Sequence, residues 1–417
     1  MSSPFQSPPR PLCWFKGFLI LSLLGFIASA SAQTVPAPSG PDVRATSNMT
    51  MLDPEFNYRT RQFVWVDVGN GNIWVGSYDR ATGNFIPEDG RGSLIEAAVS
   101  VGGLYPGLGF TLNGPEWARG TPTDYVVYTR DNAVGDPTAR NSLIGLASQN
   151  TAGTWTRQTI VTARRNGPIG SISRNSNAKI SYQDNLGTHY VRTVTDSQSE
   201  TALPGLTATG LTPVARFADN ANIVAYQVNL NGVQQAVAYN MDTKVMTQLT
   251  HDSAEKNQSW LFSAPEFNGA LALAVIAGKT RIRMYAPVVG QSGAVKYELA
   301  GSLTAPQGGQ WFSLEPFAYQ GRTYVLAQLT VAGGTYPTSI WLGGFDPANP
   351  VLRQLTPNGA SYEARADAEF VPLSTGVMIT YSKFDTRKCK PGAPSAWLCM
   401  EGLLGLFRAD TGLLPPQ

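Results

Sequence analysis

A proline-marked repeat is the feature that most constrains how this chain of 417 residues folds. Six prolines recur about every 45–60 residues, a period typical of repeat architectures. They are Pro54, Pro115, Pro168, Pro213, Pro265 and Pro316, and "AEFVP" at 368–372 opens a seventh unit. Between them, short runs rich in Val, Ile, Tyr and Thr alternate with Gly, Asn and Asp, a pattern of successive β-strands and turns. The sequence therefore predicts an all-β protein.

Each repeat is long enough for four strands. A turn between the third and fourth strands recurs as "YDRATGNF" (78–85), "YNMDTKVM" (239–246) and "FDPANPVL" (345–352). Four strands in about 45–60 residues are the spacing of propeller blades. We predict a seven-bladed β-propeller of four-stranded blades over residues 43–417. We expect its blades to begin near residues 53, 114, 167, 212, 264, 315 and 368.

The last repeat predicts how the ring closes. "GLLGLFRADTG" (402–412) supplies a third strand, and few residues follow it. We expect the N-terminal segment near 41–50 to add the missing outer strand, because pairing removes an exposed sheet edge. Residues 33–42, rich in Pro and Gly, are predicted to be a flexible leader.

The first 32 residues predict an export signal. Arg10 and Lys16 precede an apolar run at 18–30, and a small-x-small pattern ends at Ala32. These are the parts of a secretory signal peptide. We expect cleavage before Gln33 and an extracytoplasmic location, either periplasmic or secreted. The apolar run is shorter than the ~20 residues of a membrane span, so we expect no span.

Charge and cysteine content narrow the classes further. Charged residues make up 14% of the chain, and its formal net charge is +2. A nucleic-acid surface needs a concentrated basic stripe, so we expect no nucleic-acid partner. We expect a monomer that binds a polar small molecule, a saccharide or a protein. Cys389 and Cys399 flank a loop with Pro and Gly, which predicts a disulfide in an oxidising compartment; two cysteines without nearby histidines are too few for zinc.

The repeats resemble a known family. "QLTHD" and "SWLFSAPEFNG" within 248–269, with "LRQLTPNG" at 352–359, are similar to the repeat of TolB-type propellers. In that family "LT-D" ends one outer strand, and "W-SPDG" forms the next inner strand and its turn; here "PEFNG" replaces "SPDG". The resemblance covers roughly residues 45–412 and implies a propeller. It leaves function open, because such repeats occur in binding proteins, peptidase propellers and oligosaccharide lyases.

Carboxylates near the repeat markers are the first candidate site. First strands line the channel of a propeller, and five units carry a glutamate there: Glu55, Glu116, Glu266, Glu315 and Glu369. One hypothesis is a ring of acids that holds a divalent cation or serves as general acid and base. The alternative is that these carboxylates bond local backbone groups. The chain has two histidines, which excludes a three-histidine metal site, and we assign no metal ligands.

Other candidates come from loops on the expected channel-side face. The candidate catalytic residues are His251, His189, Tyr190 and Glu266. A histidine titrates near neutral pH and suits general base catalysis, but His251 also fits a seam between two blades. The candidate ligand-binding residues are Glu55, Glu116, Glu369, Arg130, Arg387 and Trp260. An aromatic such as Trp260 either stacks on a sugar ring or packs between blades.

Three functional hypotheses follow. The first is an exported propeller that binds a polar ligand or a partner protein at its channel-side face without chemistry. The second is a carbohydrate-active enzyme, a lyase or glycosidase, or another small-molecule enzyme at the channel mouth. The third is a non-catalytic assembly scaffold. An enzyme requires several acids and a histidine to converge with raised carboxyl pKa values, whereas a scaffold requires a broad exposed apolar patch.

Overall fold

The computed structural model describes residues 33–35, 37–97, 114–131, 142–161, 165–172, 176–184, 188–205, 215–219, 222–290, 295–345, 351–357, 359–389 and 400–415. All of them belong to one compact unit, Ala32–Gln417. The predicted export signal lies outside the described residues. Within them, no helix has the length and apolar character needed to cross a membrane.

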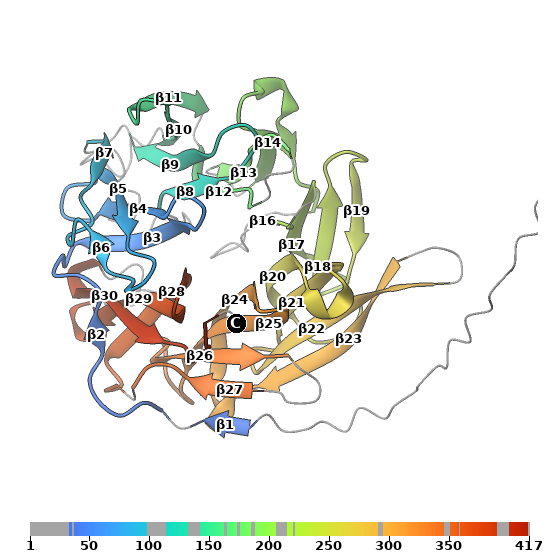
Figure 1. Cartoon of the computed structure of the whole chain (residues 1–417). Coiled ribbons are helices and arrows are strands. Elements are labelled where there is room, and N and C mark those ends of the chain that lie inside the picture. The colour runs from blue at the N-terminus through green and yellow to red at the C-terminus, as the bar shows by residue number, and fades with distance from the viewer. Residues whose placement is uncertain are drawn as a thin grey trace, which may run out of the picture. The chain divides into compact units, whose positions relative to one another are not determined.

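Seven antiparallel sheets form a ring, and Figure 1 shows the first strand of each sheet nearest its centre. The first sheet contains β3 (Met51–Asn57), β4 (Gln62–Asp67), β5 (Ile73–Tyr78) and β6 (Phe85–Ile86), with β7 (Ser93–Glu96) also paired to β5. The second contains β8 (Glu116–Ala118), β9 (Tyr125–Asp131), β10 (Ser142–Gln149) and β11 (Trp155–Val161). The third contains β12 (Arg165–Gly170), β13 (Lys179–Asp184), β14 (His189–Thr193) and β15 (Thr201–Ala202).

The remaining four sheets follow the same order. The fourth contains β16 (Arg216–Phe217), β17 (Ile223–Leu230), β18 (Val233–Asn240) and β19 (Val245–Gln248). The fifth contains β20 (Lys256–Ser263), β21 (Leu271–Ala277), β22 (Arg281–Val289) and β23 (Val295–Thr304). The sixth contains β24 (Gln310–Tyr319), β25 (Arg322–Thr330), β26 (Ser339–Gly344) and β27 (Val351–Gln354). The seventh contains β28 (Glu363–Leu373), β29 (Gly376–Asp385), β30 (Leu403–Asp410) and β2 (Val43–Arg44).

This arrangement confirms the predicted seven-bladed β-propeller of four-stranded blades. We number the blades in the order of these sheets. Short 3-10 turns occur between strands at η1 (Ser197–Ser199), η2 (Pro265–Phe267), η3 (Pro306–Gly308), η4 (Thr386–Lys388) and η6 (Met400–Gly402). Because each blade runs from the inside of the ring outwards, its first strand carries the side chains that meet at the axis.

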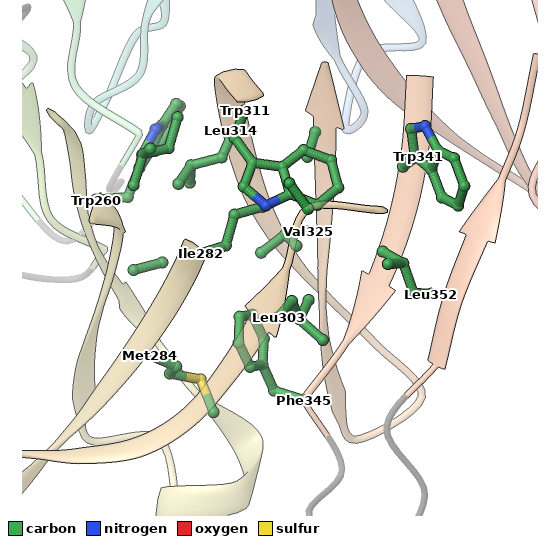
Figure 2. Packing of buried hydrophobic residues seen from close by; sticks show 14 of the residues in the cluster. Trp260, Ile282, Met284, Leu303, Trp311, Leu314, Val325, Trp341, Phe345 and Leu352 are labelled. Atoms are coloured by element: carbon green, nitrogen blue, oxygen red, sulfur yellow. The ribbon is translucent and has the colours of Figure 1, made fainter. Parts of the chain in front are cut away.

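Apolar side chains fill the space between neighbouring blades. The cluster between blades five and six contains Trp260, Trp311 and Trp341, which Figure 2 shows among aliphatic side chains from both sheets. Trp260 is 9% exposed and Trp311 is 3% exposed. Packing of this kind between sheet faces holds adjacent blades together. The packing alternative for Trp260 therefore fits the structure better than an exposed sugar platform.

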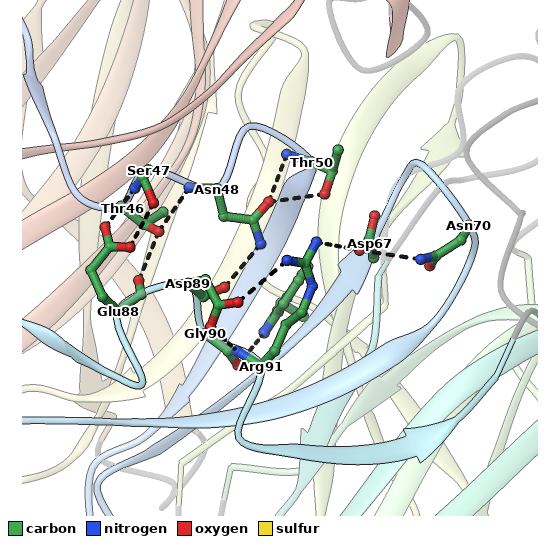
Figure 3. Close-up of polar contacts among 11 residues, drawn as sticks. Thr46, Ser47, Asn48, Thr50, Asp67, Asn70, Glu88, Asp89, Gly90 and Arg91 are labelled. Carbon is green, nitrogen blue, oxygen red and sulfur yellow. Dashed lines mark hydrogen bonds and ion pairs between the residues drawn. The ribbon is translucent and has the colours of Figure 1, made fainter.

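The N-terminal segment closes the ring in the predicted way. Strand β2 pairs antiparallel with β30, so Val43 lies opposite Arg408 and supplies the fourth strand of blade seven. The segment also continues to the first blade through a polar network shown in Figure 3. There the backbone N–H and hydroxyl of Ser47 donate to the carboxylate of Glu88 at 2.6 Å each, and Asn48 donates to Asp89 O at 2.9 Å.

The segment at 33–42, predicted to be a leader, contains a short strand. Its first residues form β1 (Gln33–Val35), which runs parallel to β27 and extends the sheet of blade six. Its last residue, Asp42, has a side chain only 4% exposed. An outer strand leaves a row of unpaired N–H and C=O groups. The edge of β27 therefore gives a nearby segment a hydrogen-bonding partner despite its Pro and Gly content.

Asp42 forms a buried clamp on blade seven. Its carboxylate accepts hydrogen bonds from Arg365 at 3.0 and 2.7 Å, from Tyr381 at 2.7 Å and from Lys383 at 2.6 Å. Burial alone would raise the pKa of this carboxyl, but the hydrogen bonds from Arg365, Lys383 and Tyr381 lower it to about 2. The clamp therefore needs the ionised carboxylate, because two cations share it in a largely buried site.

Replacing the clamp carboxylate tests ring closure. We expect Asp42→Asn to lower the free energy of unfolding by about 3 kcal/mol at pH 7, because Arg365 and Lys383 lose the buried carboxylate that they share and keep only their ion pairs with Glu363. The folded-state pKa of Asp42 is lowered, so its stabilising contribution is present above about pH 4 and is lost as the pH falls towards about 2. The measurement is chemical denaturation across pH 2–7.

The exposed Glu255 provides a control for that measurement. We expect Glu255→Gln to leave the stability unchanged, because its side chain is exposed on a loop. Equal stability of wild type and Asp42→Asn at pH 7 would contradict the role given to the clamp.

Candidate functional site

The innermost strands carry a bulge that re-aims side chains towards the axis. The pairing between first and second strands shifts by one residue in blades one, three, five, six and seven. In four of these bulges one residue has left-handed backbone: Asp53 (φ 55°), Gly167 (φ 59°), Gln258 (φ 54°) and Asp367 (φ 56°). Asp tolerates this conformation better than most residues. Bulges of this kind often lie beside functional sites, where they redirect a side chain.

Six carboxyl groups converge near the ring axis, and we name them the axial carboxyl cluster. They come from four consecutive blades, namely six, seven, one and two: Glu315, Asp367, Glu369, Asp53, Glu55 and Glu116. Burial is the largest cause that raises the pKa of each of these carboxyls. Negative charge on neighbouring carboxyls raises the pKa values of Glu55, Asp367 and Glu369 further.

Two pairs within the cluster are joined by carboxyl–carboxyl hydrogen bonds. Asp367 is bonded to Asp53, and this bond raises the pKa of Asp367 while it lowers that of Asp53. Glu369 is bonded to Glu315 in the same sense. Such a bond requires a proton between the two carboxyls of each pair. Two carboxyl groups in contact cannot both ionise readily, and each pair therefore shares one proton.

Two arginines offset part of the negative charge. Arg216 lies at the start of β16, and Arg119 follows β8; both lower the pKa of Glu116 and of Glu315. Burial still dominates at Glu116, whose pKa rises to about 8. The Arg216 guanidinium also lies over the ring of Trp260 at 4.0 Å. Arg119 donates to Phe56 O at 2.9 Å. Six acids therefore face two arginines. Bound protons neutralise part of the negative charge that the arginines do not balance.

The cluster supplies hydrogen-bond acceptors and exchangeable protons together. Among the described residues, no group of three or more His, Cys, Asp and Glu side chains is arranged to hold a metal ion. Calcium and magnesium generally need six or more oxygen ligands within about 2.6 Å. Paired carboxyls that share a proton suit a ligand with several N–H donors better than a bare ion. A cation that binds here would displace protons from the raised-pKa groups.

Sequence analysis identified part of this cluster. The structure brings together Glu55, Glu116, Glu315 and Glu369. It also adds Asp53 and Asp367, which were missed although "DPE" and "DAE" stand at equivalent bulges in blades one and seven. In blades one and seven the sequence has an acid two positions before the predicted glutamate, and this acid could have been recognised. Gly167 occupies the equivalent position in blade three. Arg216, three residues after the Pro213 marker, was also missed.

Glu266 does not belong to this cluster, which corrects the prediction. Strand β20 ends at Ser263, so Pro265 lies after the first strand of blade five and begins η2. The Glu266 carboxylate accepts from the N–H and hydroxyl of Thr323 at 2.5 and 2.6 Å, in the neighbouring blade six. Thr323 is 1% exposed. Glu266 therefore joins two blades, and the blade-five counterpart of Glu55 is Trp260, which directly follows the bulge.

The two histidines lie elsewhere. His251 is exposed on the connection between β19 and β20, and Asp252 does not orient it. Asp252 instead pairs with Lys256 at 2.9 Å and Arg283 at 3.1 Å. His189 is 4% exposed in β14, and burial lowers its pKa to about 4. The Tyr190 hydroxyl donates to Asp184 at 3.1 Å. A buried neutral histidine and an exposed one do not form the predicted catalytic group with the acids.

The remaining candidates have local partners. Arg130 forms an ion pair with Glu96 and donates to Thr159 Oγ1 at 2.6 Å. Arg387 is exposed and binds the Asp385 carboxylate at 2.9 and 2.8 Å. Cys389 follows η4, whereas Cys399 lies outside the described residues, so their disulfide stays a prediction. None of these residues contributes to the charges that shift the cluster's pKa values.

Comparisons with known proteins leave the family open. No protein-family model matches the chain, and no curated protein matches it. Similar solved structures include a complex of KlAtg21 with the coiled coil of AgAtg16, at 11% identity and TM-score 0.44 over 83% of this chain and 96% of that chain. TolB from Acinetobacter baumannii has 14% identity and TM-score 0.37 over 82% and 77%. A Lactobacillus plantarum protein has 15% identity and TM-score 0.40 over 69% and 82%.

The raised pKa of Glu116 predicts how stability depends on pH. A carboxyl whose pKa rises on folding stabilises the fold fully below its unfolded-state pKa, near 4.5, and this contribution is lost as the pH rises through about 8. We expect the free energy of unfolding to fall by at least about 1 kcal/mol more in wild type than in Glu116→Gln between pH 5 and 8.5. Denaturant titrations at fixed ionic strength measure this difference.

The control is again Glu255→Gln, which should follow the wild-type pH profile. Identical profiles for wild type and Glu116→Gln would show that Glu116 ionises as readily in the folded chain as in the unfolded chain. That result would contradict the raised pKa of Glu116.

Proposed function

We propose that this chain is an exported β-propeller that binds a positively charged, polar small molecule at the axial carboxyl cluster. The observation that carries this proposal is the set of six converging carboxyls with raised pKa values, opposed by two arginines. Buried and half-buried acids with pKa values shifted in this way are a mark of functional sites. Release of their bound protons leaves more carboxylates than arginines, which favours a cation over a neutral or anionic ligand.

The ligand class follows from the geometry of the acceptors. Carboxyls from four blades offer oxygen acceptors around one axis, and an alkylammonium group presents three N–H donors. Hydrogen bonds between charged partners are stronger than neutral ones. An amine or polyamine therefore suits the cluster better than a neutral saccharide. The sequence-based hypothesis of a polar ligand bound without chemistry is kept, with its charge now specified.

Export is part of the proposal. It is supported by the basic and apolar residues of the first 32 positions and their small-x-small ending. We propose a periplasmic or secreted location, where a Cys389–Cys399 disulfide would be stable. The exported chain would then bind its polar ligand outside the cytoplasm.

A second candidate function is acid–base catalysis by the Asp53–Asp367 pair. One carboxyl of this pair holds a proton and the other accepts one, an arrangement that resembles the proton-sharing dyad of aspartic proteases. The carboxyls of glycosidases stand about 5–9.5 Å apart, wider than a hydrogen-bonded pair, so this pair does not favour a glycosidase. Turnover with a bell-shaped pH profile that Asp367→Asn abolishes would favour the catalytic function over simple binding.

Titration calorimetry tests the binding function. We expect spermidine or putrescine to bind the purified chain at pH 8 more tightly than at pH 5, because cluster protons compete with the ligand. Glu116→Gln should weaken binding about tenfold by removing one charged contact, whereas Glu255→Gln should not change it. Calcium chloride and a neutral oligosaccharide serve as comparison ligands.

The outcomes separate the ligand classes. Binding of the neutral saccharide with equal affinity in wild type and Glu116→Gln would overturn the preference for a cation. Binding of calcium but of no amine would assign the cluster to a metal ion instead. Absence of binding by every cation at pH 8 would contradict the proposed function.

A further inference from the structure

The outer edge of blade five differs from the other blade edges. Strand β23 has ten residues, more than any other outermost strand among the described residues. No described strand pairs with its free edge, whereas β1 covers the edge of β27. Proteins usually shorten or cover such edges, because unpaired backbone groups recruit another strand. Figure 1 shows β22 and β23 extending outwards beyond the neighbouring strands.

Exposed apolar side chains accompany this free edge. Val295 is 53% exposed and Leu299 is 47% exposed on β23, and Val289 is 70% exposed on β22. Val289 lies directly opposite Val295 in the hairpin, so the two share a face. Alternation in a strand places Val295, Tyr297 and Leu299 on that face and leaves Lys296 and Glu298 on the other. The edge therefore offers an apolar row on one face and a charged row on the other.

The backbone groups that are free to pair can be assigned. Tyr297 lies opposite Pro287 of β22, and proline has no N–H to donate. In an antiparallel ladder, pairs with two hydrogen bonds alternate with pairs that have none. The Pro287–Tyr297 pair is therefore of the second kind, so the N–H and C=O of Tyr297 face away from β22. Val295 and Leu299 lie two residues before and after Tyr297, so their N–H and C=O groups also face the free edge.

We propose that the free edge of β23 pairs antiparallel with β23 of a second copy of this chain, about a two-fold axis at Tyr297. In that register Lys296 lies opposite Glu298 of the second copy, and Val295 lies opposite Leu299. Both contacts then occur twice, as in any isologous interface. Opposite charges across strands stabilise a pair, and like charges destabilise it. The sequence "VKYEL" (295–299) is therefore complementary to itself when reversed.

Charge distinguishes this register from its neighbours. Backbone groups alternate in direction along β23, so the same hydrogen-bonding pattern would also form about a two-fold axis at Lys296 or at Glu298. The first would place Lys296 opposite Lys296, and the second would place Glu298 opposite Glu298. Only the axis at Tyr297 matches both charges. Since pairing over five residues buries little surface, the dimer is expected to be weak and to depend on concentration. The monomer expected from the sequence would then be the dilute form.

Charge reversal tests the proposed pairing. We expect sedimentation velocity to show dimer formation that increases with the concentration of the purified chain. Lys296→Glu and Glu298→Lys should each weaken self-association about tenfold or more, because each creates two like-charge pairs. An equal mixture of the two variants should regain dimers, since one copy then carries two acids and the other two lysines. The double variant K296E/E298K should regain homodimers.

Controls keep the result interpretable. Both altered side chains are exposed, so circular dichroism and thermal unfolding should match wild type. A wild-type chain that stays monomeric at all concentrations would overturn the proposal. So would dimers that persist in both single variants, or a mixture that associates no better than the single variants alone.

Discussion

Closure of the ring is the constraint on which the rest of the structure depends. Seven sheets can surround one axis only if the last blade meets the first, and the buried Asp42 clamp fixes the N-terminal segment to blade seven. The contact between blade seven and blade one brings β28 beside β3, although more than 300 residues separate these strands along the chain. The Asp53–Asp367 hydrogen bond crosses this contact. The stability of the closure and the integrity of the candidate site are therefore linked.

Repulsion among acids gives the axial carboxyl cluster its chemistry. Carboxyls that are buried together raise one another's pKa, so the ring holds protons at a pH where isolated acids would be ionised. The charges are also distributed unequally around the axis. Blades six, seven, one and two supply the acids, whereas blades four and five supply Arg216 and Trp260.

The sequence predicted the architecture better than the site. Repeat period, turn residues and the incomplete last unit led to seven blades closed by β2, because each depends on local pattern. Glu55, Glu116 and Glu369 were found because they stand beside a marker proline or its equivalent. Glu266 was misplaced, because "PEF" in blade five forms a 3-10 turn after the inner strand instead of part of that strand. Asp53 and Asp367 were missed because a bulge, which no periodicity reveals, turns them to the axis.

In the proposed function, the axial carboxyl cluster stores protons that a bound cation displaces. Calorimetry of amine binding at pH 7 in buffers with different ionisation enthalpies measures the number of protons released on binding. A cluster with shared protons predicts release of about one proton or more per bound ligand. It also predicts a smaller release in the variant Asp367→Asn. Binding without net proton release in every buffer would contradict the account.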